Sequence, residues 1–319
     1  MQEKVNLRDG RTVLLLVLAT ACLSGWISPP VALAAGLVFA LAIGNPLPRR
    51  AQKTSKILLQ ASVVGLGFGM NLGTLLAAGR TGIGFTVCSI AGTLILGWWV
   101  GRMLRVESQA STLVSCGTAI CGGSAIAAVA GVIKADSRAV SVALGTVFLL
   151  NAVALFIFPP IGHWLHLTQN QFGVWSAIAI HDTSSVVGAA AKYGDEALRV
   201  ATTIKLVRAL WIVPLALGLA FFTGRKGAKV AWPWFILFFV AAACVRTWVP
   251  QGEPVYGKLV LLARLGLTLT LFLIGAQISK EALRTVGWRA LVQGVILWIV
   301  ISLAGLLAVS QLVGGTGAA

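Results

Sequence analysis

The sequence predicts an all-α integral membrane protein with about eleven transmembrane helices. Hydrophobic residues make up 58% of the 319 residues and charged residues only 11%, whereas a soluble domain carries roughly 25% charged residues. The apolar residues form long uncharged runs, which are typical of bilayer spans. The 25 Lys and Arg residues outnumber the 9 Asp and Glu residues. They lie mainly in short segments between the runs, so the basic charge indicates a lipid bilayer and not nucleic acid.

Eleven apolar segments are predicted to cross the bilayer. The second is short, because a 30 Å hydrocarbon core takes about 20 helical residues, and the first two are expected to turn at Pro29-Pro30. No cleavable signal is expected, since the first run leads directly into further apolar sequence. The segments are 12–28, 31–44, 57–78, 82–100, 111–131, 139–160, 172–190, 200–222, 231–249, 259–279 and 288–312.

The distribution of basic residues predicts the orientation of these spans. If residues 1–11 are a cytoplasmic N-terminus and every segment crosses, fifteen Lys and Arg residues fall inside and seven outside. Cytoplasmic loops collect Lys and Arg, so we expect the N-terminus inside and the C-terminus outside. The inside residues are Lys4, Arg8, Arg11, Arg49, Arg50, Lys53, Lys56, Arg102, Arg105, Arg225, Lys226, Lys229, Lys280, Arg284 and Arg289.

Two pairs of segments resemble each other within the chain. GMNLGTLLAAGRTG (69–82) is similar to GAQISKEALRTVGW (275–288), and GTAICGGSA (117–125) to DTSSVVGAA (182–190). Weak internal symmetry of this kind is typical of transporters built from inverted repeats. Chance similarity among helices rich in Gly, Ala and Leu is the alternative.

The segment SCGTAICGGSAIAAVAG (115–131) predicts a helix that breaks in the middle of the membrane. Three glycines loosen the helix, and three hydroxyls can bond the released backbone groups. The N–H groups of the second half-helix would then suit an anion. Close packing of small residues is the alternative. No metal is expected at Cys116 and Cys121, because further ligands are missing. The glycines and hydroxyls are Gly117, Gly122, Gly123, Ser115, Thr118 and Ser124.

The segment HDTSSVVGAAA (181–191) carries the one acidic residue within a predicted span, Asp182. An ionisable group at membrane depth is costly and is a functional hypothesis by default. His181 beside it ordinarily titrates near neutral pH. We therefore expect an ion-coupling or substrate role, with capping of a half-helix by Asp182, near Thr183 and Ser184, as a compatible alternative.

Lys205 and Arg208 lie three residues apart, so they share one face of a helix. Arg208 is too deep to reach the interface, and its planar fork fits an oxyanion. An ion pair with Asp182 that locks two helices is the alternative. Asn71 and Gln277 occupy matching places in the first similar pair, and Asn151 is a weaker candidate of the same kind.

Four stretches together resemble the YeiH-type family of bacterial membrane proteins, which are labelled sulfate exporters. They are SCGTAICGGSAI, HDTSSVVGAA, IKLVRALWIVPLAL and LLQASVVGLGFGMNL (58–72), and the resemblance runs from about residue 11 to 312. It implies a multi-pass protein of the bacterial inner membrane, similar in architecture to bile-acid symporters and sodium–proton antiporters. Those have inverted repeats, a panel domain and a core domain in which two broken helices cross.

These observations predict one membrane transporter domain over residues 1–319, with crossing segments near 111–131 and 172–191. The expected activity is secondary active transport of a small anion (sulfate, a related sulfur oxyanion or an organic anion) by elevator-like alternating access. Coupling to protons or sodium and a homodimer are expected, with no cofactor. The predicted substrate-binding residues are Gly117, Thr118, Gly122, Gly123, Ser124, Thr183, Ser184 and Arg208, and the predicted coupling residues are Asp182, His181 and Lys205.

Two other functional classes were weighed. An anion channel is less favoured, because two broken helices suit an occluded site and no ring-forming pore motif is present. A membrane-embedded enzyme using Cys116, Cys121 or His181 is not expected. A nucleophile needs a base and an orienting group, and on a helix the adjacent side chains of His181 and Asp182 diverge.

Overall fold

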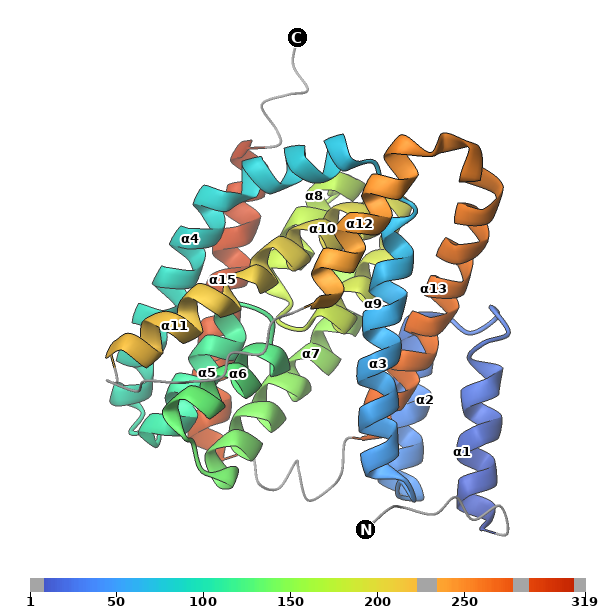
Figure 1. Cartoon of the computed structure of the whole chain (residues 1–319). Coiled ribbons are helices and arrows are strands. Elements are labelled where there is room, and N and C mark those ends of the chain that lie inside the picture. The colour runs from blue at the N-terminus through green and yellow to red at the C-terminus, as the bar shows by residue number, and fades with distance from the viewer. Residues whose placement is uncertain (1–8, 223–233, 278–286, 313–319) are drawn as a thin grey trace. The chain divides into compact units, whose positions relative to one another are not determined.

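The computed structural model describes residues 9–222, 234–277 and 287–312. These residues form α-helices and one short 3-10 helix, with no strand among them (Figure 1), so the predicted all-α class is confirmed. Contacts divide the chain into two compact units. Unit 1 comprises Met1–Leu76 with Trp234–Glu281, and unit 2 comprises Ala77–Pro233 with Ala282–Ala319.

Unit 1 is built around its longest helix, α13, which packs against α2 and α3, while α12 packs against α3. Glycines allow the closest approach. A Cβ at Gly36 would collide with the carbonyl of Phe272, and one at Gly275 with the carbonyl of Leu33. The backbones of α2 and α13 therefore touch, as small residues permit between membrane helices. The helices are α1 (Gly10–Ala21), α2 (Pro29–Ala42), α3 (Pro48–Gly67), α12 (Trp234–Trp248), η1 (Pro250–Gly252) and α13 (Glu253–Gly275).

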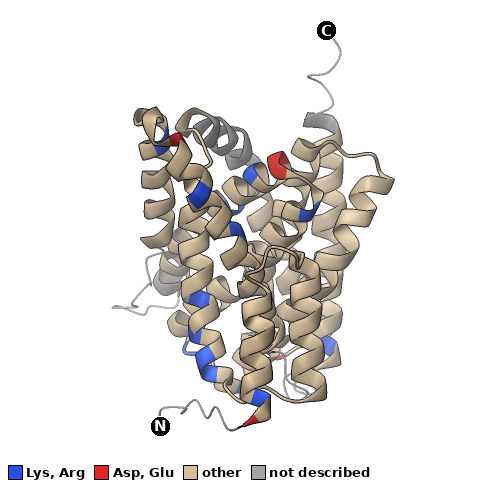
Figure 2. Cartoon of the chain, turned by 90° about the vertical axis from the view of Figure 1, so that its right-hand side faces the viewer, with Lys and Arg blue, Asp and Glu red and all other residues tan. Residues whose placement is uncertain are grey.

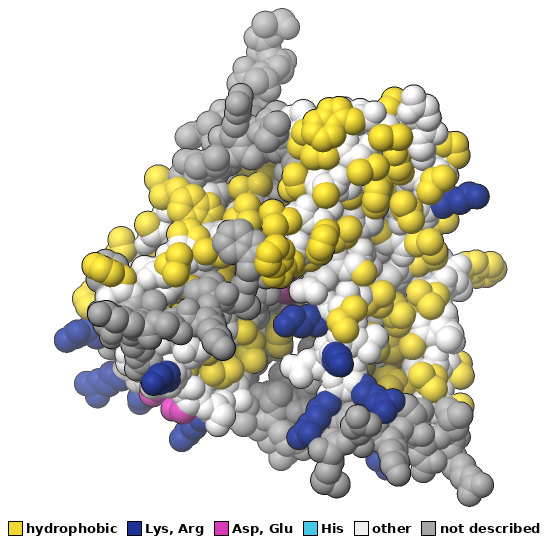
Figure 3. All heavy atoms as spheres, viewed as in Figure 1, with side chains coloured by type: hydrophobic (Ala, Val, Ile, Leu, Met, Phe, Trp, Pro, Cys, Tyr) yellow, Lys and Arg dark blue, Asp and Glu magenta, His cyan; other side chains and the backbone are white. Residues whose placement is uncertain are grey.

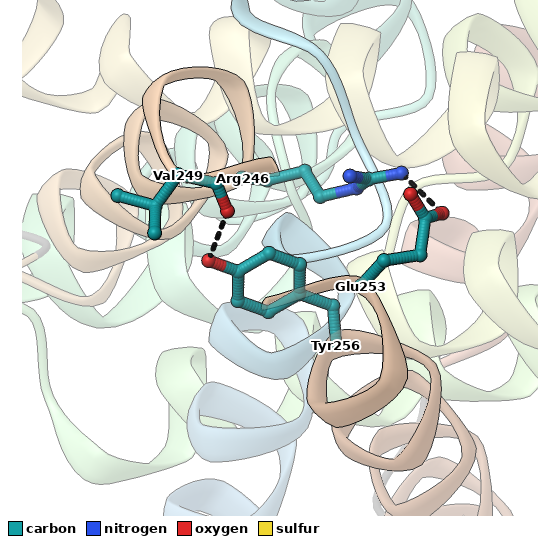
Figure 4. A network of polar contacts seen from close by, with 4 residues as sticks. All are labelled: Arg246, Val249, Glu253 and Tyr256. Atoms are coloured by element: carbon teal, nitrogen blue, oxygen red, sulfur yellow. Dashed lines mark hydrogen bonds and ion pairs between the residues drawn. The ribbon is translucent and has the colours of Figure 1, made fainter. Parts of the chain in front are cut away.

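A polar network fastens the turn between α12 and α13 (Figure 4). Arg246 pairs with Glu253 at 2.6 Å, and its guanidinium lies 5.6 Å from the ring centroid of Tyr256. The Tyr256 hydroxyl donates to the carbonyl of Val249 at 2.8 Å. Because Glu253 is largely exposed, we assign this network a local structural role worth about 1 kcal/mol at most.

Three predicted segments in unit 1 have misplaced ends, and one of them is α13, which begins at Glu253 and not at residue 259. The first helix ends at Ala21 and not near residue 28, and α3 runs over Pro48–Gly67 where 57–78 was predicted. The basic residues assigned to a loop form the first turns of α3. Arg, Lys and Gln are good helix formers, and Pro48 stands at the first helical position, where its missing N–H costs nothing.

Unit 2 contains both broken helices, and each break lies inside a segment for which the sequence predicts one. α10 packs against α8 and α9, α5 packs against α7 and α15, and α7 packs against α9. The helices are α4 (Leu72–Met103, of which residues 72–76 belong to unit 1), α5 (Ser108–Ala119), α6 (Gly123–Ile133), α7 (Ser137–Trp164), α8 (Gln169–Ala179), α9 (Thr183–Tyr193), α10 (Asp195–Leu210), α11 (Ile212–Phe222) and α15 (Trp288–Leu312).

Helix length, composition and surface all fit a bilayer. Four described helical stretches are long and apolar enough to cross: Ser137–Trp164, Asp195–Leu219, Pro250–Gly275 and Trp288–Ser310. Charged residues are sparse along the ribbon (Figure 2), and hydrophobic side chains form broad outer patches (Figure 3). Exposed apolar surface on this scale marks contact with a partner or a membrane.

Ten of the eleven predicted segments overlap one helix or one interrupted pair of helices, whereas 57–78 covers the end of α3 and the start of α4. The direction in which each segment crosses stays a prediction. The repeat candidate at 275–288 falls largely on residues 278–286, which lie outside the described residues, so the inverted repeat also stays a prediction.

Two glycines of α4 determine how closely it packs on α5. A Cβ at Gly97 would collide with Ser115, and a Cβ at Gly101 with Ser111. Gln293 of α15 joins the contact, because its Nε2 lies 3.0 Å from the carbonyl of Gly97, 2.9 Å from the Ser111 hydroxyl and 3.1 Å from the Ser115 hydroxyl. The spacing of four residues places both glycines on one face of α4.

Gly101→Ala is therefore expected to lower the melting temperature of the purified protein, because the new methyl group overlaps Ser111. Adding Ser111→Ala should restore part of the loss. Gly92→Ala is the matched control in the same helix, since a Cβ there meets no atom within 4 Å. It should be neutral or stabilising by up to about 1 kcal/mol. Equal melting temperatures for Gly101→Ala and Gly92→Ala would contradict this packing.

Candidate functional site at the two helix breaks

The first break separates α5 from α6 at residues 120–122. Gly122 adopts φ +65° and ψ −122°, a conformation that is costly for any residue with a side chain. A Cβ there would meet Val147 at 3.3 Å and Asp182 at 3.5 Å. α6 then begins at Gly123 without a side-chain cap, and Ser124 in its first turn is exposed. The first turn of α6 therefore presents backbone N–H groups that no side chain caps.

The second break separates α8 from α9 at residues 180–182. The Asn151 side-chain oxygen accepts from the backbone N–H groups of His181 at 3.0 Å and Asp182 at 3.2 Å. The Asp182 carboxylate accepts from the N–H groups of Ser184 and Ser185 and from the Ser184 hydroxyl. The capping role considered for Asp182 is thus confirmed, and its role in ion coupling stays a prediction.

Two buried cations bond to the carbonyl ends of the half-helices. Lys205 Nζ donates to the carbonyl of Ala177 at 3.2 Å and to that of Ile180 at 2.6 Å. A helix that stops in the membrane leaves carbonyls without partners and carries partial negative charge at its end. Lys205, with none of its surface exposed, donates to the unpaired carbonyls and places a positive charge at the negative end of α8.

Arg208 ties the two breaks together. Its Nε donates to the carbonyl of Ala119 at 2.8 Å, at the end of α5, and its Nη1 to that of Ile178 at 3.3 Å, in α8. Neither Arg208 nor Lys205 pairs with Asp182, whose carboxylate bonds to α9 instead. The alternative of an Arg208–Asp182 ion pair is therefore wrong for this structure, because backbone carbonyls take the place of the carboxylate.

Several buried polar atoms around the breaks have no hydrogen-bond partner in the described part of the chain. They belong to side chains at most 2% exposed, and each group can act as a donor. A buried polar group without a partner costs about 1–3 kcal/mol, so each of these groups is expected to bond to water or a ligand. The atoms are Thr118 Oγ1, Asn151 Nδ2, Arg208 Nη2 and the two ring nitrogens of His181.

The structure brings six of the predicted residues to the breaks: Thr118, Gly122, His181, Asp182, Lys205 and Arg208. A Cβ at Gly117 would meet Ile126 at 2.9 Å, so this glycine also permits the close packing weighed as an alternative. Among the remaining predicted residues, Gly123 and Ser124 form the first turn of α6, and Thr183 and Ser184 lie buried in the first turn of α9.

Sequence reasoning underrated Asn151, whose oxygen orders the second break. The available signal was a single amide within a long apolar run. Asn71 and Gln277, which were also considered, lie in unit 1. Asn71 accepts from the N–H of Gly73 at 2.7 Å, and Gln277 donates to the Ser55 hydroxyl at 3.0 Å. Their described contacts are local links within that unit.

Lys205→Met is expected to destabilise the protein, since it leaves the carbonyls of Ala177 and Ile180 without a donor. A loss of about 1–3 kcal/mol per carbonyl should appear as a lower melting temperature in detergent. Arg208→Gln should behave similarly. Arg199→Gln is the control, because Arg199 is exposed on the same helix. An unchanged melting temperature for Lys205→Met would rule out the capping role.

Comparisons with known proteins give the family. The family described as "Conserved hypothetical protein 698" matches residues 13–294. A UPF0324 membrane protein of Porphyromonas gingivalis is 60% identical over 287 residues, covering 89% of this chain and 87% of the relative. One from Bacteroides thetaiotaomicron is 57% identical over 285 residues, covering 89% and 86%, and Bd1437 of Bdellovibrio bacteriovorus is 51% identical over 306 residues, covering 94% of each. No solved structure matches the chain. The chain belongs to this family of bacterial UPF0324 membrane proteins.

Proposed function

We propose that the protein is a secondary active transporter of a small anion, which binds where the two breaks of unit 2 meet. The observation that carries this proposal is the set of unpartnered buried donors on Thr118, Asn151, His181 and Arg208. An anion with several oxygens accepts from many donors at once. A cation would gain nothing from an arginine nitrogen, so the donor set favours a negative ligand.

The charge balance around the breaks also favours an anion. Each half-helix end carries about half an elementary charge, positive at the N-terminus and negative at the C-terminus. Two N-terminal and two C-terminal ends meet at the breaks, so these partial charges cancel. With Lys205 protonated, Lys205 and Arg208 exceed Asp182 by one positive charge, and all three lie at the breaks. A monovalent anion would neutralise this excess, and low dielectric makes that attraction strong.

Arg208 has two roles in this proposal. Nε and Nη1 hold the ends of α5 and α8, and Nη2 stays available for the anion. The N–H groups at the start of α6, with the exposed hydroxyl of Ser124, would complete the site. Sulfate or a related sulfur oxyanion is the ligand that the resemblance to YeiH-type proteins implies. A dianion such as sulfate would be neutralised in full only when Asp182 is protonated, because the excess is then two positive charges.

Coupling is assigned to Asp182 and His181, which occupy the linker between α8 and α9. Binding of a proton or sodium ion at Asp182 would remove the charge that repels the anion from the same site. We further propose alternating access by an elevator-like motion in a homodimer, as the resemblance implies.

Thr118→Val is the sharpest test of anion binding. The Thr118 hydroxyl has no partner in the described structure, so its removal should leave the melting temperature unchanged or higher. The stabilisation by sulfate, sulfite or thiosulfate should weaken, whereas the wild type gains about 2.7 kcal/mol at 100 times the dissociation constant. Thr146→Val is the control, because that buried hydroxyl already donates to the carbonyl of Val142. Equal anion-induced shifts in the two variants would contradict the site.

Asp182→Asn tests the coupling in proteoliposomes loaded with the bound anion. Asparagine caps a helix about as well as aspartate, so α9 should stay folded while the ionisable group is lost. We expect exchange of labelled anion to persist and uphill accumulation driven by a proton or sodium gradient to disappear. Accumulation at the wild-type level would leave Asp182 as a cap alone. A unitary conductance in planar bilayers would instead indicate a channel.

A further inference from the structure

A cleft in unit 2 leads along α5 toward the first break. Its volume is about 390 Å³, and residues of α4, α5 and α11 line it. Ser108 and Arg102 lie at the end where α5 begins, and Ser115 and Cys116 lie near the break. Ser115 is four residues before Ala119, so the inner end of the cleft is about 6 Å, or one helical turn, from the carbonyl that Arg208 holds.

The hydroxyl groups of α5 follow one face of the helix. Ser108, Ser111, Ser115 and Thr118 are spaced by three, four and three residues, which is the period of a single helical stripe. The first three line the cleft, and the fourth carries the unpartnered buried hydroxyl at the break. A polar stripe therefore joins the cleft to the proposed anion site.

Arg102 gives the outer end of the cleft a positive charge. Its side chain lines the cleft and lies 5.8 Å from the ring centroid of Trp98. Contact with an aromatic face leaves the guanidinium donors available. Nearby Glu107 caps α5, where it accepts from the N–H groups of Gln109 and Ala110, and it does not line the cleft.

From the cavity, the hydroxyl stripe and Arg102, we propose that this cleft is the path by which the anion approaches the breaks from the end of unit 2 where α5 begins. Arg102 is the first residue that binds the anion, and the hydroxyls of Ser108 and Ser111 form the polar part of the wall along which it moves. The Ser115 hydroxyl, which donates to the carbonyl of Ser111, marks the inner end. Gln293 is a positioning residue, because its Nε2 lies within hydrogen-bond distance of the Ser111 and Ser115 hydroxyls. This inference rests on the proposed transport function.

The path can be tested by chemical labelling, which needs no transport. Thr112→Cys places a thiol on the cleft wall of a background in which the five native cysteines are replaced by alanine. Ser141→Cys is the exposed control on α7, and Ile95→Cys, 68% exposed on α4 outside the cleft lining, is the apolar control. Each variant reacts with a sulfonate and a trimethylammonium methanethiosulfonate of similar size, and the rates are normalised to a thiol in solution.

At Thr112→Cys the ratio of anionic to cationic rates should exceed that at Ser141→Cys by roughly tenfold, the low end of electrostatic focusing in charged clefts. Arg102→Gln should remove most of this preference. Arg105→Gln should not, because Arg105 lies at the same end of α4 without lining the cleft. Ser108→Cys, also on the cleft lining, repeats the measurement if Thr112→Cys folds poorly.

Three outcomes would overturn the proposal. The first is an equal ratio of anionic to cationic labelling rates at Thr112→Cys and Ser141→Cys. The second is an equal change of the Thr112→Cys ratio by Arg102→Gln and by Arg105→Gln. The third is reaction at Thr112→Cys only with a neutral lipophilic maleimide, at the rate of Ile95→Cys. The last would mean a lipid-filled groove. If the transport function were wrong, the expected labelling ratio at Thr112→Cys would still be found, but proteoliposomes would show no anion flux.

Discussion

The ends of α5 and α8 at the two breaks depend on two buried side chains that bond to backbone carbonyls. A helix that stops inside a bilayer leaves polar groups that lipid cannot satisfy, and each such group is costly there. Lys205 and Arg208 of α10 supply the donors at the ends of α8 and α5. Without them these carbonyls would need water or another donor. α10 is therefore the element that allows α5 and α8 to end where they do.

The same constraint explains why the site carries an excess of positive charge. The cations are needed to stabilise the carbonyl ends, whereas the one carboxylate at the breaks, that of Asp182, is used to cap α9. The uncapped start of α6 adds further donors. A requirement of folding thus leaves positive charge and donors at the breaks, which is the basis of the proposed anion site. An anion bound there would not compete with a preformed Arg208–Asp182 ion pair.

Local composition predicted the first break, because glycine and hydroxyl residues inside an apolar run weaken a helix and can bond the released backbone groups. The second break was implied by the resemblance to the YeiH-type family, and the residues themselves indicated only that Asp182 could cap a half-helix. The partners of Lys205 and Arg208 were not predictable, since carbonyls are present at every residue and only tertiary packing selects Ala119, Ile178 and Ile180. The start of α3 was misplaced because a basic amphipathic turn resembles a loop when only hydropathy is read. Asn151 was underrated because one amide has no spacing pattern.

The order in which the chain is synthesised affects how the two cations of α10 enter the membrane. All the carbonyls that Lys205 and Arg208 bond lie earlier in the sequence, so the ribosome has made them before α10 emerges. A lone Arg or Lys at the centre of a span costs about 2.5–3.5 kcal/mol during insertion. If α5 and α8 already occupy the bilayer, α10 can enter against their carbonyl ends and avoid that cost. Synthesis from the N-terminus thus delivers the acceptors first and the donors second.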